Sequence, residues 1–228
     1  MTPGENLPAT PVASIDPDNV AGFAKSTIDS DGNRALPDLS AVDGSGWAGS
    51  RFTVLAVGNP IMGDDGIGLE ILAQLQQLLP QRPVWQAAIA RGELALLEGG
   101  TNGMELVPVV QEAERLLILD SVAPGNGREP GQALRMSGDH VPRLLSMKIS
   151  PHQVGLLDVL SSARLTGKEP TVLEVVGVVS EKVDLNLGLT PTAASGIKPA
   201  TDLAAEVLDS WLNPYPIPPK KSRTRARG

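Results

Sequence analysis

The chain has 228 residues, a formal charge of −7 and no cysteine, and 41% of its residues are apolar. This length suits one folded domain with or without extensions, and the negative charge argues against nucleic acid as a partner. Without cysteine, disulfides, thiolate catalysis and metal–thiolate sites are excluded, so any metal ligand must be oxygen or imidazole nitrogen. No basic-then-apolar leader and no stretch of membrane-spanning length is visible, so we expect a cytoplasmic protein.

The two ends of the chain differ in composition from its middle. Residues 1–50 are rich in Pro, Gly, Ser, Asp and Asn, which predicts a disordered extension with at most a short helix around Val20–Ile28. Residues 213–228 begin with prolines and end in lysines and arginines, which predicts a disordered basic tail, solvated rather than bound to an acidic partner. One folded domain at 51–212 remains.

Within that domain, apolar runs and amphipathic runs alternate, which predicts alternating strands and helices. In chain order we expect a strand at 52–57, a helix at 65–79, a strand at 94–97, a helix at 104–110, a strand at 115–119, a helix at 153–165, a strand at 171–179 and a helix at 199–211. Continuous apolar strands separated by helices indicate an α/β fold, with a mostly parallel sheet covered on both faces.

The first strand is followed by a glycine-rich loop, V-G-N-P-I-M-G-D-D-G-I-G at 57–68. The dinucleotide-binding fingerprint fails because Asn59 and Pro60 follow Gly58, and a Walker loop would place a cation where Asp64 and Asp65 stand. Two carboxylates at a helix N-terminus would also repel a phosphate. Either aspartate could cap the helix, a contribution of about 1 kcal/mol, but a cap accounts for only one of them.

Acidic residues also follow the next two strands, and a histidine begins a later helix. Because strand C-termini and helix N-termini share one edge of a parallel sheet, we expect Asp65, Glu98, Asp120 and His152 to lie along that edge. Carboxylate oxygens with imidazole nitrogen suit a divalent cation such as Ni²⁺ or Zn²⁺. The sequence therefore predicts a cation site in which Asp64 is a helix cap or an outer supporting group.

With those residues placed, the chain resembles the hydrogenase maturation endopeptidases, which trim the C-terminal extension of nickel–iron hydrogenase large subunits. The matching stretches are Val57–Gly68, Glu98–Met104, Leu119–Asp120, His152–Asp158 and, more weakly, Val176–Thr190. They occur in the family's order over roughly the whole predicted domain.

The resemblance implies a three-layer α/β fold, with a twisted, mostly parallel five-stranded sheet between helices. By motif position, the metal-contacting and catalytic residues fall on Asp65, Glu98 and His152. The implied partner is the hydrogenase large-subunit precursor, whose inserted nickel is sensed before cleavage. The implied protease is a monomer without an organic cofactor, a nucleic-acid partner or a membrane anchor.

Several other residues receive supporting roles. We expect Asn59 to bond the backbone of its own turn and so hold Asp65, with substrate binding as the alternative. Three glycines follow the second strand, Gly99, Gly100 and Gly103. They could allow a positive φ or the close approach of another chain, and the alternative is that they simply form a loop. The sequence allows three roles for Asp120: a group that supports the site, a contact to the substrate, or the cap of the following element. His140 is expected to be an ordinary loop residue.

The chain departs from the family pattern in four places. Glu98 stands where aspartate is usual, and its extra methylene moves the carboxylate by about 1.5 Å. Residues 83–92 look like added length, Ser180 replaces a frequent proline, and the N-terminal extension has no counterpart. Two rival functions are a non-catalytic metal-sensing assembly factor and a nucleotide-binding or small-molecule α/β enzyme.

The sequence allows two mechanisms for cleavage of the peptide bond. A cation held by the three residues could polarise the scissile carbonyl or lower the pKa of a bound water. Alternatively, a carboxylate could act as general base, with the metal used only for recognition. Without a cysteine nucleophile or a G-x-S-x-G elbow, hydrolysis by activated water is the simplest mechanism.

Overall fold

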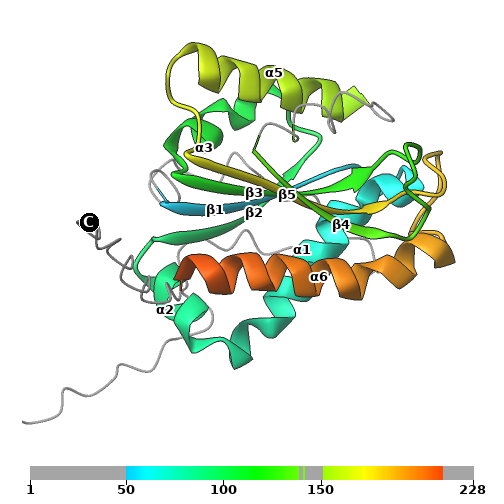
Figure 1. The fold of residues 1–228 in the computed structure, drawn as a ribbon, viewed down its shortest axis with the longest axis horizontal. Coiled ribbons are helices and arrows are strands. Elements are labelled where there is room, and N and C mark those ends of the chain that lie inside the picture. Colours follow the sequence, from blue (N-terminus) through cyan, green and yellow to red (C-terminus); the bar gives the residue numbers. More distant parts are fainter. Residues whose placement is uncertain (1–49, 139–140, 142–150, 213–228) are drawn as a thin grey trace, which may run out of the picture.

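The structure is a computed structural model that describes residues 50–138, 141 and 151–212, with the side chains of residues 151–154 left out. In this part of the chain, five strands form one sheet in the order β2-β1-β3-β5-β4 (Figure 1). The strands are β1 (Phe52–Val57), β2 (Leu94–Gly100), β3 (Arg115–Val122), β4 (Ala133–Ser137) and β5 (Val172–Val179). The four apolar strands pair in parallel and β4 pairs antiparallel with β5. The predicted mostly parallel five-stranded sheet is therefore confirmed.

Helices cover both faces of this sheet, as Figure 1 shows. The helices are α1 (Ile67–Leu78), α2 (Pro83–Ala90), α3 (Val107–Glu112), α5 (Pro151–Leu165) and α6 (Pro191–Leu212), and the short 3-10 turns are η2 (Gly63–Gly66), η3 (Leu79–Gln81) and η4 (Met104–Leu106). One buried cluster joins the sheet to α1, α2 and α6, and a second joins it to α3 and α5. The three-layer architecture expected from the sequence is confirmed.

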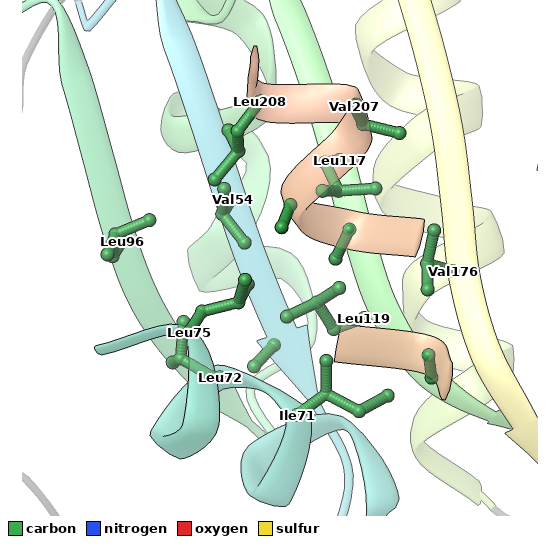
Figure 2. Packing of buried hydrophobic residues seen from close by; sticks show 14 of the residues in the cluster. Val54, Ile71, Leu72, Leu75, Leu96, Leu117, Leu119, Val176, Val207 and Leu208 are labelled. Atoms are coloured by element: carbon green, nitrogen blue, oxygen red, sulfur yellow. The ribbon is translucent and has the colours of Figure 1, made fainter. Parts of the chain in front are cut away.

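The two clusters arise from the alternation of side chains along each strand. Figure 2 shows Val54, Leu117 and Leu119 from the sheet facing Ile71 of α1 and Leu208 of α6. The intervening strand residues belong to the second cluster, beneath α3 and α5. Burying each such aliphatic side chain stabilises the fold by about 1.5–3 kcal/mol.

The connections reverse direction at the centre of the sheet. From β1 the chain passes through α1 and α2 to β2 on one side, and from β2 it returns through α3 to β3 on the other side. The crevice between the C-terminal ends of β1 and β3 is therefore the topological switch point, where open α/β sheets bind ligands.

Three elements differ from the sequence prediction. Residues 83–92, expected to be added length, contain α2, whose Trp85 is fully buried and donates a hydrogen bond to Asp209 of α6 at 2.9 Å. The polar edge strand β4 was not predicted, because its residues are half-exposed and pair only with β5. Helix α6 begins at Pro191 rather than Pro199.

The early start of α6 has a packing cause. A Cβ added to Gly196 would lie 2.4 Å from the Gly131 carbonyl oxygen and 2.5 Å from a methyl group of Val178. Glycine at this position lets the first turns of α6 lie directly on the sheet edge, and this contact keeps Pro199 inside the helix despite its missing N–H.

The predictions for both chain ends, including the short helix at 20–28, concern residues 1–49 and 213–228, which lie outside the described residues, as does His140. In the described part of the chain, no helix has both the length and the apolar character needed to cross a bilayer.

Candidate active site

The loop after β1 is built around Gly58. Its φ is +133°, and a Cβ added there would lie 2.0 Å from the backbone oxygen of Asp65. This close approach allows the Asn59 N–H to donate to Asp65 Oδ2 at 3.1 Å. The Asn59 side chain in turn accepts from the Ile61 N–H at 3.2 Å, the local turn bond predicted for it. The loop therefore fixes one oxygen of the Asp65 carboxylate.

Helix α1 begins directly over the switch point. A Cβ added to Gly68 would lie 2.4 Å from the Val57 carbonyl oxygen, at the end of β1, and 2.3 Å from that of Leu119, within β3. Asp65 is buried just before this helix, and Ser121 on β3 donates to its Oδ1 at 3.5 Å. The Asp65 carboxylate is thus placed between β1 and β3, where the sequence analysis expected a ligand.

Asp64 does not cap a helix, which corrects one of the two sequence interpretations. Gly66 occupies the N-cap position of α1, and the Asp64 carboxylate points to a different part of the chain. Its Oδ2 accepts from the Glu181 N–H at 2.8 Å, the Lys182 N–H at 3.0 Å and the Thr190 hydroxyl at 3.0 Å. Its Oδ1 accepts from the Thr190 N–H at 2.7 Å.

The partners of Asp64 were missed by the sequence analysis. Thr190 is also the N-terminal cap of α6, since its hydroxyl oxygen accepts from the Ala193 N–H at 3.2 Å. Asp64 therefore ties the loop after β1 to the loop between β5 and α6. The only sequence signal was the weak late match at 176–190, which contains all three donor residues.

Glu98 lies on β2, opposite Ala56 of β1, and is half-buried. Because it alternates with Leu94 and Leu96, its side chain is on the face covered by α1. Directly after it, Gly99 is an extra residue in a bulge, since Gly100 pairs with Val57.

One of the three glycines after Glu98 has the positive φ that the sequence suggested, and another packs closely within the chain. Gly100 has a φ of +54°, and a Cβ added to Gly99 would lie 2.8 Å from Leu55 Cδ1. A Cβ added to Gly155 of α5 would lie 3.3 Å from the Gly103 Cα, so the first turn of α5 approaches the loop after β2. The positive φ predicted for this glycine cluster is thus found at Gly100, whereas the approach of another chain stays a prediction.

Asp120 is fully buried on β3, and its Oδ1 accepts from the Ser121 N–H at 2.7 Å. It alternates with Ile118 and Val122, whose side chains belong to the cluster beneath α3 and α5, so it occupies the face opposite that of Ser121. Since β3 continues to Val122, Asp120 does not cap a helix.

His152 is the second residue of α5. The contact between Gly103 and Gly155 brings the backbone of this helix start to the edge of the sheet where Asp65 and Glu98 lie. Among the side chains that the structure describes, which exclude His152, no three of His, Cys, Asp or Glu form a group able to hold a metal ion. The three-ligand site therefore stays a prediction.

Comparison with known proteins decides the family. The HycI hydrogenase maturation protease profile matches residues 84–207, more than half of the chain. The hydrogenase 2 maturation protease of Escherichia coli (strain K12) is 38% identical over 169 residues, which are 73% of this chain and 96% of that protein. The chain belongs to the hydrogenase maturation protease family.

Further relatives support the assignment of this hydrogenase maturation protease to its family. The hydrogenase expression/formation protein HupD of Bradyrhizobium diazoefficiens is 33% identical over 71% of this chain and 80% of its own length. The structure of the hydrogenase maturating endopeptidase HybD from Escherichia coli matches with a TM-score of 0.61 at 37% identity, covering 71% of this chain and 93% of that one. The chain is thus a peptide-bond hydrolase of hydrogenase maturation, and neither rival function is favoured.

Proposed function

We propose that this protease removes the C-terminal extension of a nickel–iron hydrogenase large-subunit precursor after nickel insertion, acting in the cytoplasm as a monomer. The observation that carries the proposal is the buried Asp65 carboxylate, held between β1 and β3 by Asn59 and Ser121. Its position at the switch point is where this fold class presents its reacting groups.

Asp65, Glu98 and His152 would together contact the nickel that arrives with the precursor. Carboxylates and imidazole are donors that suit this cation, and Glu98 lies on the α1 face of the sheet, the face on which Ser121 contacts Asp65. When bound, the cation would supply Lewis-acid polarisation of the scissile carbonyl or of an attacking water.

The residues of this chain would orient the reacting groups. The Asn59 N–H and the Ser121 hydroxyl hold the Asp65 carboxylate in one orientation, and burial keeps bulk water from this side of it. A carboxylate fixed in this way can accept the proton of an attacking water within hydrogen-bond reach, as an aspartic-type general base.

Asp120 is a second candidate for the third ligand in place of Glu98. It is fully buried, it lies on β3 beside Ser121, and it occupies the face covered by α5, whose second residue is His152. Glu98 is half-buried on the edge strand and carries the longer side chain.

The direct test is a gel-shift assay with a nickel-loaded large-subunit precursor from the same genome. We expect the native protease to shorten the precursor, the double variant Asp65→Asn, His152→Ala to leave it intact, and the control His140→Ala to cut at the native rate. Failure of the native protein to shorten any such precursor would contradict the proposal.

Single variants in the same assay separate the candidate ligands. If Glu98 is a ligand, Glu98→Gln lowers kcat/KM by about 100-fold or more and Asp120→Asn has a smaller effect, because ligand loss removes metal contact altogether. The opposite ranking would assign the ligand role to Asp120. If both variants are as active as the native protein, neither Glu98 nor Asp120 is a ligand.

A further inference from the structure

Three large aliphatic side chains are exposed on two adjoining loops close to Asp65. Ile61, after β1, is 50% exposed, and Leu185 and Leu187, after β5, are 79% and 77% exposed. We call these three residues the rim patch. Isolated exposed leucines are ordinary, but a group of them on neighbouring segments marks an interaction surface.

Backbone hydrogen bonds bring the two loops side by side. The Asn186 N–H donates to the Ile61 carbonyl oxygen at 3.1 Å, and the Gly63 N–H donates to the Asn186 carbonyl oxygen at 2.8 Å. Met62 and Asn186 thus form a parallel bridge. Ile61, Leu185 and Leu187 are therefore the chain neighbours of the two bridged residues, Met62 and Asn186.

The bridge is rigidly supported from below. Asp64 binds the backbone N–H groups of Glu181, Lys182 and Thr190, which bracket the two leucines in the sequence. Gly63, with a φ of +60°, is enclosed by the same loop, since a Cβ there would lie 3.2 Å from the Lys182 carbonyl oxygen. Side chains on a fixed loop lose little entropy on binding, which favours a docking role.

Three charged residues, Glu181, Lys182 and Asp184, precede the leucines of this loop. Lys182 pairs with Asp184 at 2.5 Å, and this hydrogen bond and attraction raise the pKa of Lys182. The three side chains of the rim patch are themselves uncharged, so the complementary partner surface is aliphatic.

We propose that the rim patch docks an aliphatic surface of the hydrogenase large-subunit precursor next to its scissile bond. The inference rests on the proposed function. Ile61 precedes Asp65 by four residues, a separation of at most about 14 Å even in an extended chain. A folded protein whose scissile bond reaches Asp65 therefore comes within reach of the patch, whereas a second copy of this chain seated there would block the site.

The test compares two double variants of the full chain. Leu185→Ser, Leu187→Ser removes the two most exposed patch side chains. The matched control, Val84→Ser, Leu165→Ser, removes side chains that are 40% and 88% exposed at the start of α2 and the end of α5, away from the site. With nickel-loaded precursor, we expect the patch variant to raise KM at least about tenfold with kcat within twofold, and the control to change neither.

Binding is measured separately in an Asp65→Asn background, where the precursor is not cut. There we expect the patch variant to raise Kd for the precursor about tenfold or more, a difference of about 1.4 kcal/mol. Equal Kd and KM for the patch variant and its control would overturn the docking proposal while the protease proposal stands. Absence of any cleavage by the native protein would instead overturn the proposed function, and Kd would still decide the docking.

Discussion

At the scale of single residues, the two adjacent aspartates have separate tasks. Asp65 lies between two strand ends and is held by Asn59 and Ser121. Asp64 accepts four hydrogen bonds from residues more than a hundred positions away. Asp65 is the residue proposed to take part in cleavage, and Asp64 holds together the two loops beside it.

Replacing Asp64 by asparagine is expected to destabilise the fold by about 2–4 kcal/mol. The carboxylate accepts hydrogen bonds at both oxygens, so the amide group of asparagine would face at least one donor that it cannot pair, and buried donors left unpaired are costly. Urea unfolding measures the change.

The control for this variant is Asp184→Asn. Asp184 pairs with Lys182 at the surface, where such pairs contribute about 0–1 kcal/mol. A loss for Asp64→Asn no larger than that of the control would contradict the structural role assigned to Asp64.

Replacing Gly58 by alanine is expected to cost more than about 3 kcal/mol, because a Cβ would collide with the Asp65 backbone at 2.0 Å in a conformation that only glycine adopts readily. Gly167→Ala is the matched control, since its φ is +67° but nothing lies within 4 Å of the added Cβ. There the backbone strain alone applies, about 1–2 kcal/mol. Thermal unfolding of both variants measures the difference, and equal losses would show that the contact with Asp65 is unimportant.

Much at this scale could be predicted from sequence, and some could not. The turn bond of Asn59 and the positive φ of Gly100 follow from local residue preferences, which short stretches reveal. Three of the four donors to Asp64 are backbone N–H groups, and a backbone donor leaves no trace in residue type. Whether Glu98 or Asp120 meets Asp65 also depends on strand register, which composition does not encode.

At the scale of elements, the long apolar strands and amphipathic helices are found where the sequence placed them. β1 matches the predicted 52–57, β3 continues three residues beyond the predicted 115–119, and β5 begins one residue later than the predicted 171–179. Their buried apolar runs carry the signal. β4 and the start of α6 were missed because contact with β5 and close packing at Gly196 decide them, and both are tertiary effects.

The starts of β1 and β3 are joined by an ion pair between Arg51 and Glu114, with Nε to Oε2 at 2.6 Å. The hydrogen bond from Arg51 and its positive charge lower the pKa of Glu114. A depressed folded pKa adds stability that is complete above the ordinary pKa of glutamate and is lost as pH falls through the folded pKa.

Glu114→Gln should therefore lower the urea midpoint slightly at pH 7, and the difference from the native protein should vanish as the pH falls below the pKa of Glu114. Urea unfolding over a series of pH values checks this. A difference between the two proteins that stays constant down to acid pH would contradict the assignment of the lowered pKa to this pair.

At the scale of the whole molecule, one edge of the sheet gathers the parts that the proposed function needs. The Asp65 loop, the bulge after Glu98, the start of α5 and the rim patch all lie at the edge where the parallel strands end (Figure 1). Parallel topology alone predicted that Asp65, Glu98 and Asp120 would share this edge. It did not predict the rim patch, because exposed leucines in a loop have no periodic signature.

The central claim is nickel-dependent removal of the precursor's C-terminal extension, and intact-mass spectrometry tests it most directly. The native protease would be incubated with the precursor in its nickel-loaded and nickel-free forms. We predict one new product with the mass of a precursor lacking its C-terminal extension, formed only with nickel and abolished by Asp65→Asn. An unchanged mass in both forms, or cleavage that persists in Asp65→Asn, would contradict the account.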